Sequence, residues 1–306
     1  MQIYIDKNSL KDIIFDKLKK VFGEHDFVYE PNKDVIIAVV SPNRVKASLL
    51  DQMPNLKWIQ LTTVGYNQID LEDLRKRNIC LTNAKDVYSI TIAEDIITKL
   101  LVINRNVKKY IKQMSEGKWI AYDNEHELYN ANIGFLGSGS LAVHANERLK
   151  AFKTFSMCYR QKQEKHPMFD ETYYTKNGLI SLLKKADYVI NTLPLTDSTK
   201  HLLNKESLSY MKKDAVIINV GRGEVIDQQA LIEALENHRI RGAALDVTTP
   251  EPLPKGSKLW YMDNVYITPH NAPSSPYMFN RLYKLVEENL IRYFKNESLL
   301  NIVKLQ

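Results

Sequence analysis

The sequence is constrained most by an alternation of short apolar runs with longer amphipathic segments. In the first part of the chain, the runs QIYI, DVIIAVV and LKWIQLTT alternate with the segments LKDIIFDKLKKVF and RVKASLLDQM. Runs rich in Ile, Val and Tyr are typical of strands, and the longer segments have helical periodicity. Because neighbouring parallel strands need a crossover, strands that alternate with helices predict a parallel α/β sheet.

The alternation begins again at Asn132 with the apolar run NIGFL. The strand-like runs TFSMCY, DYVINTL, AVIINV, RGAALDV and NVYITPH follow, and helical segments separate most of them. This is the chain order of a doubly wound dinucleotide-binding domain. Residues 91–112 and residues 276–294 predict two further helices. The first of these has Thr91 as a possible cap and is long enough to bridge two domains.

Length and composition allow two folded domains and exclude several classes of partner. With 306 residues, 44% of them hydrophobic, the chain can fill more than one core. The 42 basic and 36 acidic residues are scattered, so we expect no nucleic-acid-binding face. The N-terminus lacks a long apolar core and no later run approaches the length of a membrane span, so we expect no membrane partner.

The two cysteines also bear on the compartment. Cys80 and Cys158 are far apart and belong to no CxxC or Cys/His pattern that suits a metal. We therefore expect two buried free thiols, no metal site and a reducing, cytoplasmic location.

The run NIGFL leads into a loop with the spacing of a phosphate-binding turn. The first glycine would make a tight turn, and the second would let the backbone approach a pyrophosphate at the helix N-terminus. Ala142 stands where a third glycine is expected and is small enough for close packing. An ordinary strand, turn and helix is the alternative, but the strands that follow favour a cofactor site. The expected cofactor-binding residues of this loop are Gly137, Ser138, Gly139, Ser140 and Leu141.

The end of the next strand should select between the two nicotinamide dinucleotides. An acidic residue about 20 positions past the loop would bind the ribose 2′-hydroxyl of NAD. This region reads MCYRQKQEK, so Arg160 follows Tyr159 where an acid is expected, with Lys162 close by. Arginine pairs well with a phosphate group, so we expect NADP(H) to be favoured over NAD(H). A solvated basic turn is the alternative.

Three short strings in the second half carry groups suited to catalysis. VGRGE presents Arg222 between two glycines, TTPEPLP contains Glu251, and TPHNA contains His270. Each string follows a predicted strand, and open α/β sheets bind ligands at the carboxyl ends of their strands. Any one of the three could be a surface ion-pair partner or a solvated loop residue. The three together, in this order after the glycine-rich loop, indicate an active site.

These strings and the segments around them resemble the D-isomer-specific 2-hydroxyacid dehydrogenase family, in particular its glyoxylate/hydroxypyruvate reductases. NTLPLTDSTKHLLNKESLSYMKKDAVIINVGRGEVID and ALDVTTPEPLP are similar to that family's signatures. LTTVGYNQIDL resembles its substrate-side loop, and TIAEDIITKLL its interdomain helix, so the resemblance covers essentially the whole chain. It implies an NAD(P)-dependent enzyme that transfers a hydride between NAD(P)H and the carbonyl carbon of a small 2-oxo acid.

The resemblance assigns roles to the catalytic and substrate-binding residues. His270 would be the general acid and base, and Glu251 would orient its ring and favour its protonated form. Arg222 would bind the substrate carboxylate and polarise the 2-oxo group. Backbone amides near Val64 and Gly65 would hold the other side of the carboxylate.

The resemblance also assigns further cofactor-binding residues. Leu193, Pro194 and Thr199 would lie near the adenosine, and Val220 and Asp246 near the nicotinamide. Asp246 ends a predicted strand, and without the resemblance it could equally cap the turn that follows.

The family architecture implies two doubly wound α/β domains and a homodimer. Residues 99–275 would form the Rossmann dinucleotide-binding domain. Residues 1–98 and 276–306 would form a discontinuous, flavodoxin-like substrate domain, and residues 91–112 would contribute to the dimer interface.

Departures from the family pattern leave the substrate open. The turn NAKDVYSI lacks a glycine that many relatives have, and Asn271 and Pro273 replace commoner residues beside Ala272. A phosphoglycerate dehydrogenase-type enzyme is one alternative, although the chain ends at Gln306, too soon for an added regulatory domain. A dinucleotide-sensing, corepressor-like interaction protein is another, and the retained catalytic residues count against it.

Overall fold

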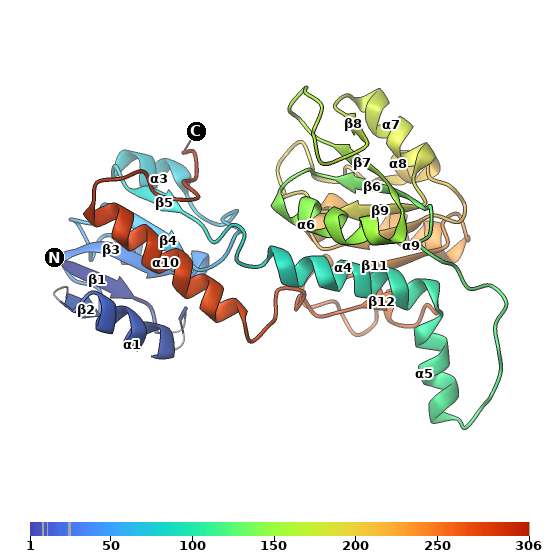
Figure 1. Ribbon diagram of the computed structural model, residues 1–306, viewed down its shortest axis with the longest axis horizontal. Helices are drawn as coiled ribbons and strands as arrows, with labels where there is room; N and C mark the ends of the chain where they lie inside the picture. Colours follow the sequence, from blue (N-terminus) through green and yellow to red (C-terminus); the bar gives the residue numbers. More distant parts are fainter. Residues whose placement is uncertain (8, 11, 24–25, 306) are drawn as a thin grey trace. The chain divides into compact units, whose positions relative to one another are not determined.

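The computed structural model describes residues 1–7, 9–10, 12–23 and 26–305, which form two compact units (Figure 1). Unit 1 comprises Met1–Tyr88 and Ser274–Gln306, and unit 2 comprises Ser89–Pro273. The first boundary therefore lies ten residues before the predicted one, which falls inside a helix. That helix, α4 (Ser89–Asn104), belongs wholly to unit 2 because it packs on α6 (Ser140–Leu149) and on three strands of that unit's sheet.

Unit 1 is built on a five-stranded parallel sheet with strand order β2-β1-β3-β4-β5. This is the flavodoxin-like order, as predicted. The strands are β1 (Gln2–Ile5), β2 (Asp26–Val28), β3 (Val35–Val40), β4 (Trp58–Leu61) and β5 (Cys80–Thr82). The helices are α1 (Asp12–Val21), α2 (Ala47–Leu50), α3 (Leu71–Lys76) and α10 (Met278–Phe294), with a 3-10 turn at Pro42–Arg44.

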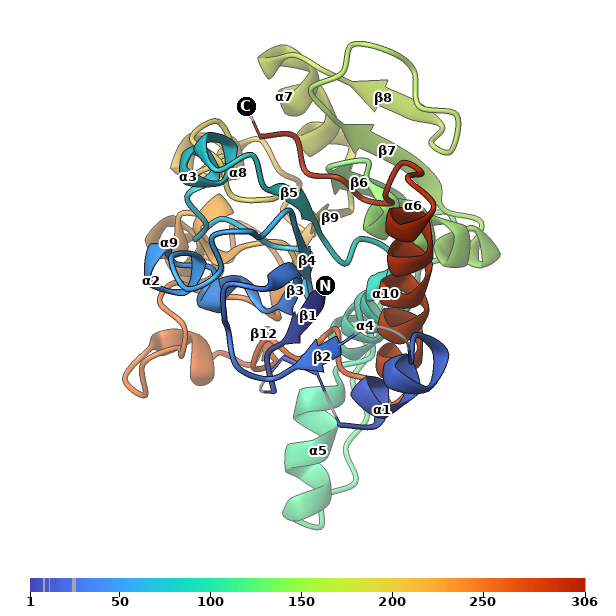
Figure 2. The same ribbon diagram turned by 90° about the vertical axis from the view of Figure 1, so that its left-hand side faces the viewer.

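Both faces of the unit 1 sheet are covered, because successive side chains of a strand point to opposite faces. Ile3, Ile37 and Trp58 belong to the core under α1 and α10, and Tyr4 and Ile59 belong to the core on the other face. Although α10 follows unit 2 in the chain, it packs beside α1 (Figure 2). This packing makes unit 1 discontinuous in sequence.

Unit 2 is built on a seven-stranded parallel sheet with strand order β12-β11-β10-β9-β6-β7-β8. The strands are β6 (Asn132–Leu136), β7 (Phe155–Tyr159), β8 (Glu171–Tyr173), β9 (Tyr188–Asn191), β10 (Val216–Asn219), β11 (Gly242–Leu245) and β12 (Val265–Ile267). The order reverses at β6, as in a Rossmann fold, so the predicted fold class is confirmed.

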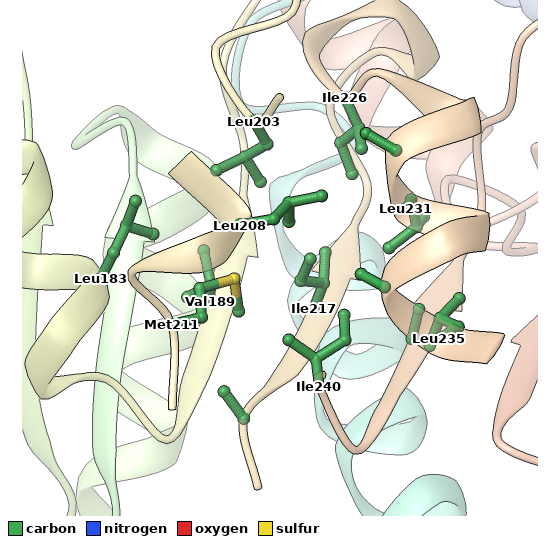
Figure 3. Close-up of a cluster of buried hydrophobic side chains, with 14 of the residues drawn as sticks. Leu183, Val189, Leu203, Leu208, Met211, Ile217, Ile226, Leu231, Leu235 and Ile240 are labelled. Atoms are coloured by element: carbon green, nitrogen blue, oxygen red, sulfur yellow. The ribbon is translucent and has the colours of Figure 1, made fainter. Parts of the chain in front are cut away.

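Unit 2 also contains α5 (Val107–Ser115), α7 (Lys176–Lys185), α8 (Lys205–Ser209), α9 (Gln228–Glu236) and 3-10 turns at Lys150–Phe152, Gly223–Val225 and Lys258–Trp260. Figure 3 shows the core between the sheet and helices α7, α8 and α9, where Val189 and Ile217 meet Leu208 and Leu231. The opposite face packs against α4 and α6.

The helix predicted over residues 91–112 is two helices. Asn106 adopts a left-handed backbone conformation with φ of 50° and forms the N-cap position of α5. Asparagine tolerates this conformation better than most residues, so the chain can turn there. The first helix begins at Ser89, two residues before the expected cap Thr91. No helix in the described part of the chain has the length and apolar character needed to span a membrane.

Candidate active site

The glycine-rich loop joins β6 to α6 and fits a dinucleotide pyrophosphate. Gly137 has φ of 100°, and a Cβ there would lie 2.7 Å from Thr192 Oγ1, so both conformation and space require glycine. Gly139 is the N-cap of α6, and a Cβ there would meet nothing within 4 Å. The open space therefore lies where the free N–H groups of the helix can bind an anion.

The residues that follow the loop pack close to the sheet and to the start of α4. Ala142 is fully buried between α6 and the sheet, which suits a small side chain at the third position of the motif. Ser140 Oγ is 3.2 Å from Ser89 Oγ at the start of α4. Ser138 and Leu141 are both partly exposed on the same turn.

Arg160 lies at the carboxyl end of β7, directly after Tyr159. Its side chain is mostly buried, and one guanidinium nitrogen lies 3.9 Å from Glu164 Oε1. Lys162 Nζ lies 2.5 Å from the same carboxylate oxygen. Hydrogen bonding by Lys162 lowers the pKa of Glu164, against a smaller effect of burial. The end of β7 therefore carries two cations and one carboxylate.

The turn after β9 is held rigidly beside the loop. Thr199 Oγ1 donates to Pro194 O at 2.7 Å, and Leu193 N donates to Asn191 Oδ1 at 3.1 Å. Gly221 packs against this turn, because a Cβ there would lie 2.7 Å from Leu193 O. Val220, nearly buried, donates its N–H to Asn191 O. The predicted adenosine-side and nicotinamide-side residues thus flank one edge of the sheet.

Arg222, Glu251 and His270 line one pocket of about 240 Å³ in unit 2. They come from the segments that follow β10, β11 and β12, which end at the same edge of the parallel sheet. His270 Nδ1 lies 2.8 Å from Glu251 Oε2, and Glu251 Oε1 accepts from Thr248 N at 3.2 Å. Because Nδ1 is engaged, Nε2 is the ring nitrogen that can face a substrate.

Hydrogen bonds and close packing fix the backbone at Arg222. Asn219 Nδ2 donates to Arg222 O, and Arg222 donates from a terminal nitrogen to Gly221 O at 2.8 Å. Gly223 is fixed beside it, since a Cβ there would lie 2.1 Å from Thr248 O. Burial lowers the pKa of the Arg222 guanidinium, and the Glu251 carboxylate opposes that shift. A guanidinium remains charged at neutral pH even so, and can bind a carboxylate.

The segment that carries His270 is tied to Asp246, the residue directly after β11. The Asp246 carboxylate accepts from Thr268 Oγ1 at 2.5 Å and from the N–H groups of Asn271 and Ala272 at 3.1 to 3.2 Å. Its carbonyl oxygen accepts from His270 N at 2.8 Å. Asp246 thus caps the turn after β12, whereas the alternative left open by the sequence was a cap on the turn that directly follows Asp246.

Val64 and Gly65 belong to unit 1 and lie in the loop after β4. Asn83 Nδ2 donates to Val64 O at 2.9 Å, and Thr63 Oγ1 donates to Gly65 O at 3.3 Å. Tyr88 donates its hydroxyl to Thr62 O, and burial raises the pKa of Tyr88 to about 12. The backbone of this loop is therefore fixed by neighbouring side chains within its own unit.

Asp86 stands in the turn that lacks the family's glycine. Its φ is 73°, a left-handed conformation that glycine adopts at little cost. The chain therefore makes a glycine-like turn with a residue that pays a steric penalty for it.

Sequence reasoning missed three polar residues that support the site. Asn219 and Thr268 were passed over although each stands at the end of an apolar run, which is a usable signal. Lys99 on α4 gave no such signal, because a lysine in a helical pattern is usually exposed. In the described part of the chain, no three His, Cys, Asp or Glu side chains are grouped so as to hold a metal ion.

Comparisons with known proteins identify relatives of this chain. The family model "D-isomer specific 2-hydroxyacid dehydrogenase, NAD binding domain" matches residues 97–272. The glyoxylate reductase of Thermofilum pendens is 34% identical over 273 residues, which are 87% of this chain and 80% of that protein. The glyoxylate reductase of Pyrococcus horikoshii is 31% identical over 300 residues, 95% of this chain and 85% of that protein.

A solved structure extends the likeness to the whole fold. The NADPH-dependent glyoxylate/hydroxypyruvate reductase of Sinorhizobium meliloti, solved in complex with citrate, superposes with a TM-score of 0.84 and 26% identity, covering 99% of this chain and 98% of that one. The chain therefore belongs to the D-isomer specific 2-hydroxyacid dehydrogenase family and is an NAD(P)-dependent oxidoreductase that reduces a 2-oxo acid.

Proposed function

We propose that His270 is the general acid that protonates the carbonyl oxygen of the 2-oxo acid, and the base in the reverse direction. The observation that carries this proposal is the 2.8 Å contact between His270 Nδ1 and Glu251 Oε2, in a pocket that Arg222 also lines. A carboxylate on Nδ1 orients the ring and supports its cationic form. The bound nicotinamide supplies the hydride, and Nε2 of His270 supplies the proton.

Arg222 binds the carboxylate of the substrate in this proposal. Its backbone is fixed on both sides, by Asn219 and by the close packing of Gly223 on Thr248. A guanidinium forms two parallel hydrogen bonds with a carboxylate and can polarise the adjacent 2-oxo oxygen. The family resemblance further implies that backbone N–H groups near Val64 and Gly65 bind the substrate carboxylate.

The test is steady-state oxidation of NADPH against a panel of 2-oxo acids. His270→Asn is the informative variant, because His270 has φ of 51° and asparagine tolerates that conformation. Loss of the general acid should lower kcat by about 10²- to 10⁴-fold. Turnover by the variant at the rate of the wild type, with the same fold by circular dichroism, would refute the assignment.

The substrate that we propose is glyoxylate or hydroxypyruvate. The relatives from Thermofilum pendens and Pyrococcus horikoshii are glyoxylate reductases, and the Sinorhizobium meliloti structure is a glyoxylate/hydroxypyruvate reductase. A D-3-phosphoglycerate dehydrogenase of Methanocaldococcus jannaschii is 32% identical, but this chain spans 53% of its length. The panel therefore includes phosphohydroxypyruvate, and a kcat/KM highest for that compound would replace our assignment.

NADP(H) is the proposed cofactor. Arg160 and Lys162 supply two cations at the end of β7, where a 2′-phosphate would lie. Structures of an imino acid reductase and of a Xanthobacter autotrophicus relative, 25% and 26% identical, were solved with NADPH.

We also propose a homodimer. In both ribbon views, α5 and the segment after it stand away from the unit 2 sheet (Figures 1 and 2). This arm, defined as residues 107–126, exposes large apolar side chains: Ile111, Met114, Trp119 and Ile120. Exposed apolar clusters of this kind mark protein–protein contact surfaces.

A further inference from the structure

Lys99 is a fully buried lysine on α4 whose partners are both carboxylates. Its ammonium bonds to Asp95, one helical turn earlier, and lies 3.9 Å from Asp246 Oδ1. The Lys99 side chain is 0% exposed and that of Asp246 is 2% exposed. A charge removed from water is strongly unfavourable unless it is paired, so this lysine needs its two partners.

Asp246 is the partner that connects Lys99 to the catalytic segment. Its carboxylate accepts three donors from residues 268–272, and its carbonyl accepts the N–H of His270. The left-handed backbone of His270 is unfavourable by itself and persists only where its surroundings hold it. The hydrogen bonds to Asp246 stabilise this conformation.

The two carboxylates and the ammonium form one buried group, in which the single ammonium offsets one of the two negative charges. Burial raises the pKa of the Asp95 carboxyl, the bond to Lys99 lowers it, and the charge on Asp246 raises it. Without the ammonium, the two carboxylates would repel each other in a poorly hydrated region. That repulsion would disturb the Asp246 carboxylate, which accepts the donors of the catalytic segment.

We propose that Lys99 is a positioning residue for His270, because its ammonium offsets the charge of the Asp95 carboxylate and so keeps the Asp246 carboxylate in place and bonded to residues 268–272. The catalytic consequence rests on the role proposed for His270. The structural consequence does not, because it concerns the hydrogen bonds of Asp246 alone.

The first measurement is hydrogen exchange by mass spectrometry on the protein without cofactor. The backbone N–H groups of residues 268, 270, 271 and 272 all donate to acceptors in the folded protein. The exchange rate of the peptide that spans these residues therefore measures how firmly the segment is held. In Lys99→Met, which keeps an unbranched side chain one atom shorter than lysine and removes the charge, this peptide should exchange about tenfold faster than in the wild type. Lys184→Met, which removes an exposed lysine from α7, should leave the peptide unchanged.

The decisive variant is the double substitution Asp95→Asn with Lys99→Met. It removes one negative and one positive charge, so the Asp246 carboxylate no longer lies beside an uncompensated carboxylate. If Lys99 acts by offsetting the charge of Asp95, protection of residues 268–272 should return to within about twofold of the wild-type value. If the double variant exchanges as fast as Lys99→Met, the lysine acts by packing and the proposal is wrong.

The value of kcat gives an independent test of the proposal. Displacement of His270 should lower kcat of Lys99→Met by about tenfold to a hundredfold, and the double variant should recover most of it. Wild-type exchange and wild-type kcat in Lys99→Met would overturn the proposal.

If Lys99→Met does not fold, the double variant decides alone. A folded double variant with a protected segment supports the proposal, and an unfolded or unprotected one refutes it. Should His270→Asn keep full turnover, the exchange result would still stand by itself.

Discussion

Arg160 is the residue on which cofactor choice should depend. Its side chain is largely buried at the end of β7, and the 3.9 Å separation from Glu164 makes a weak ion pair that a phosphate could replace. We predict that Arg160→Asp reverses the preference, with the ratio of Kd for NADPH to Kd for NADH rising about a hundredfold. Intrinsic-fluorescence titration with both dinucleotides measures this ratio.

Glu164 provides the matched control for Arg160. Its carboxylate lies near both cations, so Glu164→Gln should tighten NADPH binding severalfold and leave NADH binding unchanged. An unaltered Kd ratio in Arg160→Asp would show that the end of β7 does not read the 2′-position.

The residues that we propose to be catalytic could be predicted from the sequence for a topological reason. Arg222, Glu251 and His270 follow three successive strands, and the carboxyl ends of parallel strands meet at one edge. Lys99 could not be found, because nothing in a helical pattern distinguishes a lysine that bonds to a buried carboxylate from one in solvent. The positive φ of His270 was equally invisible, since it results from contacts with Asp246.

At the scale of elements, the Asp187 carboxylate links the start of β6 to the start of β9 by hydrogen bonds. It accepts from Asn132 N at 2.8 Å and Asn132 Nδ2 at 3.0 Å, and from Lys212 Nζ at 2.7 Å. Burial raises the pKa of the Asp187 carboxyl, but the hydrogen bonds from Lys212 and Asn132 outweigh burial and the pKa lies below its usual value. The folded state therefore favours the ionised form.

Asp187→Asn should consequently destabilise the protein in a pH-dependent way. A carboxyl whose pKa is depressed by folding contributes stability above its unfolded pKa of about 3.9, and this contribution is lost as pH falls through the lower folded value. Because the group is partly exposed, we expect a loss of only ~1 kcal/mol in the free energy of unfolding at pH 7. Urea denaturation at pH 7 and pH 3 should show a difference between the variants that shrinks at pH 3, and an equal difference at both would contradict the linkage.

Most elements followed from periodicity, and the exceptions have physical causes. Strands β5 and β8 are three residues long, too short for an alternating pattern to emerge. The break between α4 and α5 depends on the conformation of Asn106, in a segment whose apolar periodicity continues across it. Local composition therefore predicts the long elements. It does not predict a break that depends on the conformation of one residue, or a short strand at the edge of a sheet.

At the scale of the whole molecule, the arm of residues 107–126 should determine assembly. Trp119 is fully exposed and Met114 is 78% exposed, and both lie on the part of unit 2 that stands away from its sheet. We predict that the 35.4 kDa chain sediments as a dimer and that Trp119→Ser with Ile120→Ser shifts it towards monomer.

Analytical ultracentrifugation over a range of concentrations measures this equilibrium. Tyr277→Ser, which removes an exposed aromatic side chain from unit 1, should leave the dimer intact. Equal sedimentation of the wild type and the arm variant would place any interface elsewhere.

The four glycines described at the candidate site divide into three that the folded chain needs and one that it does not. Gly137, Gly221 and Gly223 have no room for a methyl group, whereas Gly139 has ordinary φ and open space around it. An alanine at position 139 would disturb no neighbour in the protein, and its methyl group would stand where the backbone must approach a bound pyrophosphate. At this position the choice of side chain can change affinity for the dinucleotide while the stability of the fold stays the same.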